Sequence, residues 1–192
     1  MREATDPSIV YVTDLVTCSN KREFRLKYPL LAFKFEPQLI IGDLVHKGLE
    51  SLLSSRGWEV EVSVEKSIDV DGKMYRVLGR VDLLKRDDNG NIVDVVEVKT
   101  VRELVDRFPL EHHLLQLRVY LELLEANRGR ILYVSRNRIV EYEVERGEIS
   151  IESMVRETIY NTAIPRYSWE CRYCTYKKIC PYAAQEEHSS SS

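Results

Sequence analysis

The sequence of 192 residues lacks the features that mark membrane, secreted or strongly charged proteins. No apolar run approaches the ~18 residues that a membrane-spanning helix needs. Residues 1–8 contain no basic start followed by an apolar stretch, so no signal peptide is expected and the predicted location is the cytoplasm. The formal net charge is only −3, which excludes a global electrostatic attraction to DNA or to membranes. Any contact with nucleic acid must then come from local basic clusters.

The sequence does contain enough apolar material for a folded core. Hydrophobic residues make up 44% and charged residues 31% of the chain, which excludes an intrinsically disordered protein. A chain of this length is one domain of ordinary size with room for a small appendage. No internal repeat and no long linker divides it.

Four cysteines are the most specific feature of the composition. One stands near the N-terminus and three stand close together near the C-terminus: Cys18, Cys171, Cys174 and Cys180. Disulfides are a poor explanation in an intracellular protein, whereas a C-x2-C pair is typical of metal or redox sites. Zinc sites usually consist of two close pairs, so the one-plus-three spacing favours an iron–sulfur cluster. A zinc site and ordinary buried cysteines are the alternatives.

Hydrophobic periodicity predicts alternating helices and strands. The predicted helices cover residues 13–27, 38–56, 110–127 and 150–160, with a short helical turn over 102–106. The predicted strands cover residues 58–70, 73–85, 92–100, 130–134 and 139–144, with a hairpin turn at Asp71-Gly72. This order predicts an α/β or α+β fold in which helices flank one mixed sheet whose hairpins are antiparallel.

Two predicted strands carry charged residues among apolar ones. Asp82 lies within the apolar segment 79–84, and Glu97 lies with Lys99 in the Val-rich segment 95–100. Glu97 and Lys99 are two residues apart and so share one face of a strand. Asp82 and Glu97 belong to neighbouring strands, so their carboxylates can converge on a divalent cation. Taken alone, the pattern also fits an exposed sheet face or a structural ion pair.

Three residues on predicted helices complete this set. His46 lies on the helix before the first strand and could add an imidazole ligand. Gln116 and Tyr120 are four residues apart and share one face of the 110–127 helix. Each of the three by itself is an ordinary helix residue.

Together these residues resemble the PD-(D/E)XK nuclease superfamily in its RecB-like branch. That branch is marked by a helical His, a G-x-x-D strand, an E-x-K strand and a Q-x-x-x-Y helix, in the order found here. With its four cysteines, the chain resembles the CRISPR-associated RecB-like exonucleases that carry an iron–sulfur cluster. The resemblance implies a restriction-endonuclease-like nuclease core at 38–148 between an N-terminal helical segment at 1–37 and a cluster segment at 149–185, with a disordered tail at 186–192.

The resemblance also assigns roles to individual residues. The implied metal ligands for Mn²⁺ or Mg²⁺ are His46, Asp82, Glu97 and the Val98 carbonyl. The implied catalytic set is Asp82, Glu97, Lys99, Gln116 and Tyr120, with Lys99 orienting or activating water or stabilising phosphoryl charge. The implied iron–sulfur cluster, [4Fe–4S] or [2Fe–2S], would be held by the four cysteines.

The activity implied by the resemblance is a metal-dependent DNA exonuclease that prefers single-stranded DNA or single-stranded ends. Its implied role is to trim DNA fragments before CRISPR spacer integration, together with the spacer-integration complex; endonuclease activity stays open. Two alternatives stand beside this reading. One is a DNA-repair nuclease of the same branch, and the other is a non-catalytic, metal-stapled module that binds nucleic acid.

Local basic clusters provide the predicted DNA contacts. The main candidates lie near Cys18 and within the C-terminal cysteine segment: Lys21, Arg22, Arg25, Tyr173, Tyr176, Lys177 and Lys178. Further basic candidates are Arg128, Arg130 and Arg172. The two tyrosines could stack on bases. The other interpretation is a set of solvated charges, with tyrosines packed against the cluster.

Overall fold

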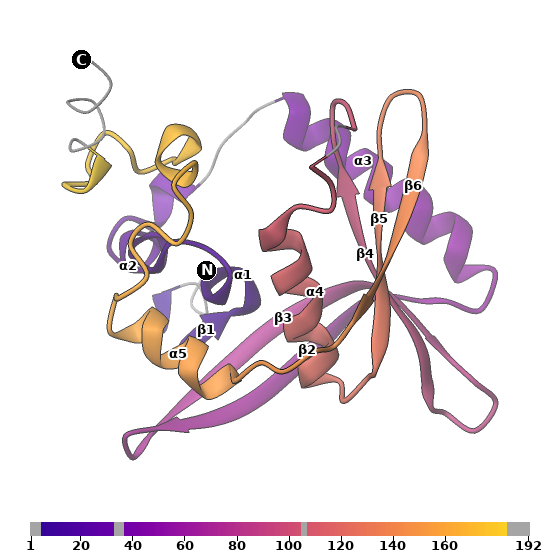
Figure 1. Ribbon diagram of the computed structural model, residues 1–192, viewed down its shortest axis with the longest axis horizontal. Coiled ribbons are helices and arrows are strands. Elements are labelled where there is room, and N and C mark those ends of the chain that lie inside the picture. The colour runs from indigo at the N-terminus through magenta and orange to yellow at the C-terminus, as the bar shows by residue number, and fades with distance from the viewer. Residues whose placement is uncertain (1–4, 33–36, 105–106, 184–192) are drawn as a thin grey trace. The chain divides into compact units, whose positions relative to one another are not determined.

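Figure 1 shows the computed structural model, which describes residues 5–32, 37–104 and 107–183. The chain forms two compact units. Unit 1 comprises Met1–Lys34, Ser67–Val77 and Ser150–Ser192, and unit 2 comprises Phe35–Lys66 and Leu78–Ile149. The predicted tail at 186–192 lies outside the described residues. Within the described part of the chain, no helix is long and apolar enough to cross a bilayer.

Unit 2 is built on a mixed sheet. Its elements are α3 (Pro37–Ser54), β4 (Ile92–Thr100), α4 (Glu111–Leu123), β5 (Arg128–Val134), β6 (Ile139–Glu145) and parts of β2 (Glu59–Val70) and β3 (Lys73–Arg86). Strands β3 and β4 pair antiparallel, β4 and β5 pair parallel, and β5 and β6 pair antiparallel. The α4 helix forms the crossover between the two parallel strands, as a parallel pair requires. The predicted mixed α/β fold is therefore confirmed.

Helices cover both faces of this sheet (Figure 1). On one face, Leu49 and Leu53 of α3 pack against a core of Leu83, Val96 and Val98. On the other face, α4 packs closely over the start of β5. A Cβ atom at Gly129 would lie 2.5 Å from the Val95 carbonyl oxygen and 3.1 Å from Leu121 of α4, so only glycine fits there.

Unit 1 contains short helices and the tip of the β2–β3 hairpin. Its elements are β1 (Ile9–Tyr11), α1 (Val12–Leu15), α2 (Ser19–Lys27), η2 (Pro29–Ala32), α5 (Ile151–Ile159) and η3 (Glu170–Tyr173). Strand β1 was not predicted, because three residues are too few to show alternation. The hairpin turn is confirmed: Asp71 and Gly72 have φ angles of 54° and 78°. The Asp71 carboxylate accepts hydrogen bonds from Arg156 and Tyr160.

The prediction of one helix over 13–27 is wrong. The chain forms α1 and α2 instead, and Cys18 between them has an extended ψ of 123°. The Cys18 N–H donates to Glu170 Oε1, and the Ser19 N–H donates to the Ala163 carbonyl. These partners, more than 140 residues away in sequence, replace the bonds of a continuous helix.

The predicted helical turn over 102–106 is absent from its described part, residues 102–104. The preceding Val101 N–H donates to the Val134 carbonyl, which continues the pairing of β4 with β5 beyond the strand end. Residues 105 and 106 lie outside the described residues.

Candidate active site and cysteine pocket

A carboxylate and an ammonium group meet on β4. Glu97 and Lys99 point to the same face of the strand, as predicted from their spacing, and Lys99 Nζ lies 2.7 Å from Glu97 Oε1. The Glu97 side chain is only 4% exposed, and that of Lys99 is 19% exposed. The pair is therefore inside the unit, which excludes the interpretation of Glu97 as part of a solvated sheet face.

The α4 helix adds an amide to this pair. Gln116 Nε2 donates to Glu97 Oε1 at 2.8 Å, and Gln116 Oε1 accepts from Lys99 Nζ at 2.9 Å. Tyr120, one turn later on the same helix face, is 3% exposed and hydrogen-bonded to Gln116. Burial raises the pKa of Tyr120, so its hydroxyl stays neutral. Glu97, Lys99 and Gln116 thus form a closed three-membered hydrogen-bond ring.

The second oxygen of Glu97 has a different environment. Glu97 Oε2 is buried and has no hydrogen-bond partner among the described residues. Burial raises the pKa of Glu97 to about 7, although Lys99 opposes this shift. A buried carboxylate oxygen without a partner is costly, and a cation placed there would relieve the cost.

Asp82 and His46 lie beside this group. The Asp82 carboxylate accepts a hydrogen bond from the Val98 N–H at 2.7 Å through Oδ2, and its Oδ1 lies 3.5 Å from His46 Nδ1. Hydrogen bonding to Asp82 raises the pKa of His46. The antiparallel pairing of β3 with β4 begins at Leu83 and Val96. Asp82 lies one residue before this paired stretch, and its side chain accepts a hydrogen bond from a backbone N–H of β4.

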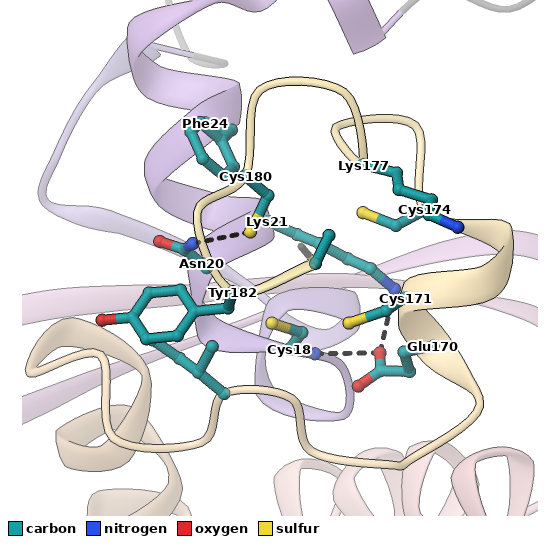
Figure 2. A pocket seen from close by; sticks show the side chains of 12 residues that line it. Cys18, Asn20, Lys21, Phe24, Glu170, Cys171, Cys174, Lys177, Cys180 and Tyr182 are labelled. Carbon is teal, nitrogen blue, oxygen red and sulfur yellow. Dashed lines mark hydrogen bonds and ion pairs between the residues drawn. The ribbon is translucent and has the colours of Figure 1, made fainter. Parts of the chain in front are cut away.

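The four cysteines line one pocket within unit 1, which Figure 2 shows with the sulfur atoms gathered around it. Cys18 and Cys171 are buried, and Cys174 and Cys180 are partly buried; none forms a disulfide. Burial raises the pKa of the Cys18 thiol to about 11. The N-terminal and C-terminal cysteines, more than 150 residues apart, are thereby brought together as the one-plus-three pattern predicted.

Polar side chains join the two segments that form this pocket, and their role was not predicted from the sequence. Glu170 is fully buried and accepts hydrogen bonds from the Cys18 N–H, from Lys21 Nζ and from the Arg166 and Tyr167 N–H groups. Asn20 Nδ2 lies 3.4 Å from Cys180 Sγ (Figure 2). Glu170 stands directly before Cys171, but no spacing rule marks such a glutamate.

Neither the residues around Glu97 nor the four cysteines are arranged as a complete set of metal ligands. Across residues 5–32, 37–104 and 107–183, no three His, Cys, Asp or Glu side chains stand in positions to hold one ion together. The assignment of ligands to His46, Asp82, Glu97, Val98 and the cysteines stays a prediction.

The predicted DNA-binding residues have divergent environments. Arg22 is 8% exposed and donates to the Pro7 carbonyl, and Arg25 pairs with Asp14. Lys21 pairs with Glu170, and Tyr176 is 7% exposed and packs against Phe24. These four candidates make hydrogen bonds, ion pairs or packing contacts within unit 1, which favours structural roles for them. The exposed candidates are Tyr173, Lys177 and Lys178.

Comparisons with known proteins agree with this geometry. Residues 54–181 match the PD-(D/E)XK nuclease superfamily. The CRISPR-associated exonuclease Cas4 of Saccharolobus solfataricus is 40% identical over 182 residues, which covers 92% of this chain and 89% of that protein.

Solved structures show the same relationship. The crystal structure of SSO0001 superposes with a TM-score of 0.85 and 37% identity, covering 92% of this chain and 87% of that chain. The alkaline exonuclease LHK-Exo from Laribacter hongkongensis superposes with a TM-score of 0.57 over 84% of this chain and 89% of its own. Its identity is 12%, so that likeness shows the fold alone. The predicted resemblance is confirmed, and the chain belongs to the PD-(D/E)XK nuclease superfamily and, within it, to the CRISPR-associated Cas4 exonucleases.

Proposed function

We propose that unit 2 hydrolyses DNA from its ends with a divalent metal ion bound at Glu97. The observation that carries this proposal is the Glu97 carboxylate: Oε1 is held by Lys99 and Gln116, whereas the buried Oε2 has no partner among the described residues. Such an oxygen suits a hard cation. Family membership supports the same chemistry.

The residues around Glu97 fit a divalent ion by the nature of their donor atoms. Asp82 and Glu97 offer carboxylate oxygens, His46 offers an imidazole nitrogen, and the Val98 carbonyl is the fourth candidate. A histidine in the set suits Mn²⁺ at least as well as Mg²⁺. When bound, the ion supplies Lewis-acid activation of water and neutralises charge that develops on the phosphoryl group.

The remaining residues position the reacting groups. Lys99 keeps its ammonium group 2.7 Å from Glu97 and 2.9 Å from Gln116, so it can donate a hydrogen bond to a phosphoryl oxygen or to the attacking water at a fixed place. Gln116 fixes the orientation of both partners, and the neutral hydroxyl of Tyr120 fixes Gln116. Loss of Lys99 would remove the only ammonium group of this ring.

The cysteine pocket of unit 1 fits an iron–sulfur cluster by its donor set. Four thiols line it, and Asn20 can donate a hydrogen bond to a ligand sulfur. We assign the cluster to Cys18, Cys171, Cys174 and Cys180. Because these residues come from both ends of the chain, cluster binding would add its free energy to the folding of unit 1.

The proposed substrate is DNA that is single-stranded or has single-stranded ends. The proposed task is the trimming of fragments before they enter a CRISPR array, in company with the spacer-integration complex. The relative in S. solfataricus is named a CRISPR-associated exonuclease, which supports a CRISPR role for this chain, and the trimming step and its partner complex are our proposal. Among the exposed side chains, Tyr173, Lys177 and Lys178 are the proposed DNA contacts in unit 1.

The test is cleavage of end-labelled single-stranded DNA in Mn²⁺ by anaerobically purified protein. We expect the wild type to release nucleotides and Lys99→Ala to release none, because the ammonium group of the ring is lost. Lys85→Ala, an exposed lysine on β3, serves as the matched control and should cleave like the wild type. Equal cleavage by the wild type and Lys99→Ala would place the active site elsewhere.

The pathway is tested in cells. A strain that carries Lys99→Ala in place of the wild type should acquire spacers with altered lengths or ends. Unaltered spacers would leave the nuclease assignment intact and would move its role toward DNA repair.

A further inference from the structure

We infer that unit 2 holds a nucleotide of the DNA strand in a second pocket, at the carboxyl ends of β4 and β5, beside the candidate active site. The pocket is lined mainly by Ile41, Val45, Thr100, Arg102, Val134 and Arg136. This inference rests on the proposed function, because it deepens how the same nuclease grips its substrate.

The pocket has the size of a small-molecule site. Its cavity of about 370 Å³ falls within the ~300–1,000 Å³ range of such pockets. The backbone that forms it is held in place, because the Val101 N–H donates to the Val134 carbonyl at 2.9 Å. Thr100 and Val134 are partners in the parallel pairing of the two strands. The pocket is therefore built on strand ends rather than on a loop alone.

The pocket borders the candidate active site through two elements. Val45 precedes His46 on α3, and Thr100 follows Lys99 on β4. Neighbouring Cα atoms are about 3.8 Å apart, so each element places one residue in the candidate site and the next one in the pocket. Successive side chains of a strand point to opposite faces, which puts the pocket on the α3 side of β4. The pocket and the Glu97–Lys99 pair thus lie on opposite faces of β4, and a DNA strand that passes around the carboxyl end of β4 contacts both.

The charges of the pocket suit a phosphate. Arg102 and Arg136 are exposed, and their guanidinium groups make no hydrogen bond or ion pair with the described residues. No acidic side chain is among the described residues that line the pocket. By contrast, Arg130 pairs with both Asp94 and Glu141. One guanidinium group can donate two parallel hydrogen bonds to the oxygens of a phosphate. Two arginines without a partner among the described residues therefore favour a phosphorylated ligand at this pocket.

The rest of the lining suits the nucleoside. Ile41 is 56% exposed although it is a large apolar side chain, and Val45 and Val134 continue the apolar surface. Thr100 Oγ1 is buried and has no hydrogen-bond partner among the described residues, so the wall of the pocket contains an unsatisfied hydroxyl. An anionic group attached to a flat, weakly polar body is the chemistry of a nucleotide. In a nuclease, the ligand with this chemistry is a nucleotide of the DNA substrate next to the cleaved bond.

The experiment measures binding separately from cleavage. Every protein carries Lys99→Ala and is kept free of divalent ions, and the probe is a fluorescein-labelled oligothymidylate of about twelve nucleotides. We expect Arg102→Ala and Arg136→Ala each to weaken binding by about two- to fivefold. The slope of log K against log salt should fall by roughly 0.7 for each arginine removed.

Control substitutions come from the carboxyl end of α3, away from the pocket residues of that helix. Arg56→Ala removes an exposed arginine just after the helix, and it should leave both affinity and salt slope unchanged. Ile41→Ala should weaken binding about threefold, whereas Leu52→Ala, which truncates a side chain that is 51% exposed on the same helix, should not. With an abasic oligonucleotide the Ile41→Ala effect should disappear, because the base contact is then missing.

The outcomes separate this inference from the proposed function. If Arg102→Ala and Arg136→Ala bind DNA like Arg56→Ala, the pocket is not a nucleotide site, even when the wild type cleaves DNA in Mn²⁺. If the wild type does not cleave, the proposed function fails, whatever the arginine variants do. Weaker binding with a smaller salt slope in only the two pocket variants would support the inference.

Discussion

The Glu170 carboxylate accepts a hydrogen bond from the Cys18 N–H at 2.9 Å, although the two residues are separated by 152 positions in sequence. The same carboxylate pairs with Lys21 and is itself fully buried. It thus joins the helix that begins after Cys18 to the segment that carries the other three cysteines. The cysteine pocket is therefore held by a polar network as well as by whatever the thiols bind.

Replacing Glu170 should destabilise unit 1. Glu170→Ala leaves Lys21 and three backbone N–H groups without their acceptor, and we expect a loss of about 2–4 kcal/mol in the free energy of unfolding. Urea denaturation measures this loss, and visible absorbance per protein should fall with it if the pocket holds an iron–sulfur cluster. The control is Glu152→Ala, which removes an exposed partner of Arg156 and should cost less than about 1 kcal/mol. A Glu170→Ala protein as stable as the control would contradict the proposed role.

Binding of Mn²⁺ should depend on Glu97. Because an ion that binds only the folded protein stabilises it, Mn²⁺ at a hundred times its dissociation constant should add about 2.7 kcal/mol to the stability of the wild type. Glu97→Gln removes the buried charge, so its melting temperature should not respond to Mn²⁺. Glu59→Gln alters an exposed carboxylate on β2 and should respond like the wild type. A full response in Glu97→Gln would move the metal site away from Glu97.

His113 should make stability depend on pH. Its Nδ1 lies within hydrogen-bond distance, 2.8 Å, of the Tyr133 hydroxyl, which also accepts a hydrogen bond from the Leu110 N–H. Burial and the Lys99 charge lower the pKa of His113 to about 2. In the unfolded chain this histidine has a pKa of about 6.5, so below that pH it binds a proton that it does not bind in the folded protein. Stability from this group is complete above pH ~6.5 and is lost as the pH falls below that value.

The size of the pH effect can be measured by urea denaturation. Between pH 7 and pH 5 the wild type should lose up to about 2 kcal/mol through His113. His113→Gln keeps a side chain that can hydrogen-bond to Tyr133 but does not titrate, so this variant should lose less stability between pH 7 and pH 5, by about that amount. His112→Gln, the neighbouring substitution, should keep the wild-type slope. An unchanged slope in His113→Gln would show that His113 is protonated in the folded protein.

Two glycines should respond to alanine in opposite directions. Gly129→Ala places a methyl group 2.5 Å from the Val95 carbonyl oxygen, so β5 and β4 must shift, at a cost of about 1–3 kcal/mol. Gly48 lies within α3 with nothing within 4 Å of an added Cβ, so Gly48→Ala should stabilise the protein by up to about 1 kcal/mol. Denaturation midpoints of the two variants test this contrast. A neutral Gly129→Ala would mean that the strands are less closely packed than described.

The sequence by itself determined the local features of this protein. The period of two along a strand put Glu97 and Lys99 on one face, and Asp71-Gly72 specified a tight hairpin turn, because both follow from backbone geometry within a few residues. The order of short motifs was enough to identify the nuclease family, since each motif keeps its place on its own helix or strand. Strand β1 was not predicted because three residues are too few to show an alternating pattern.

The tertiary structure alone decided which polar groups meet. Nothing near Glu170 indicated that it would bind the Cys18 backbone, and this contact splits the predicted 13–27 helix in two. Likewise, Arg22 was predicted to lie on the exposed side of its helix, but it is buried within unit 1, and the burial of Tyr176 agrees with packing, the second of its two predicted environments. The physical reason is that a side chain's burial and partners depend on segments that packing brings together from far along the chain. A buried polar group must then find its partner among whatever those segments present.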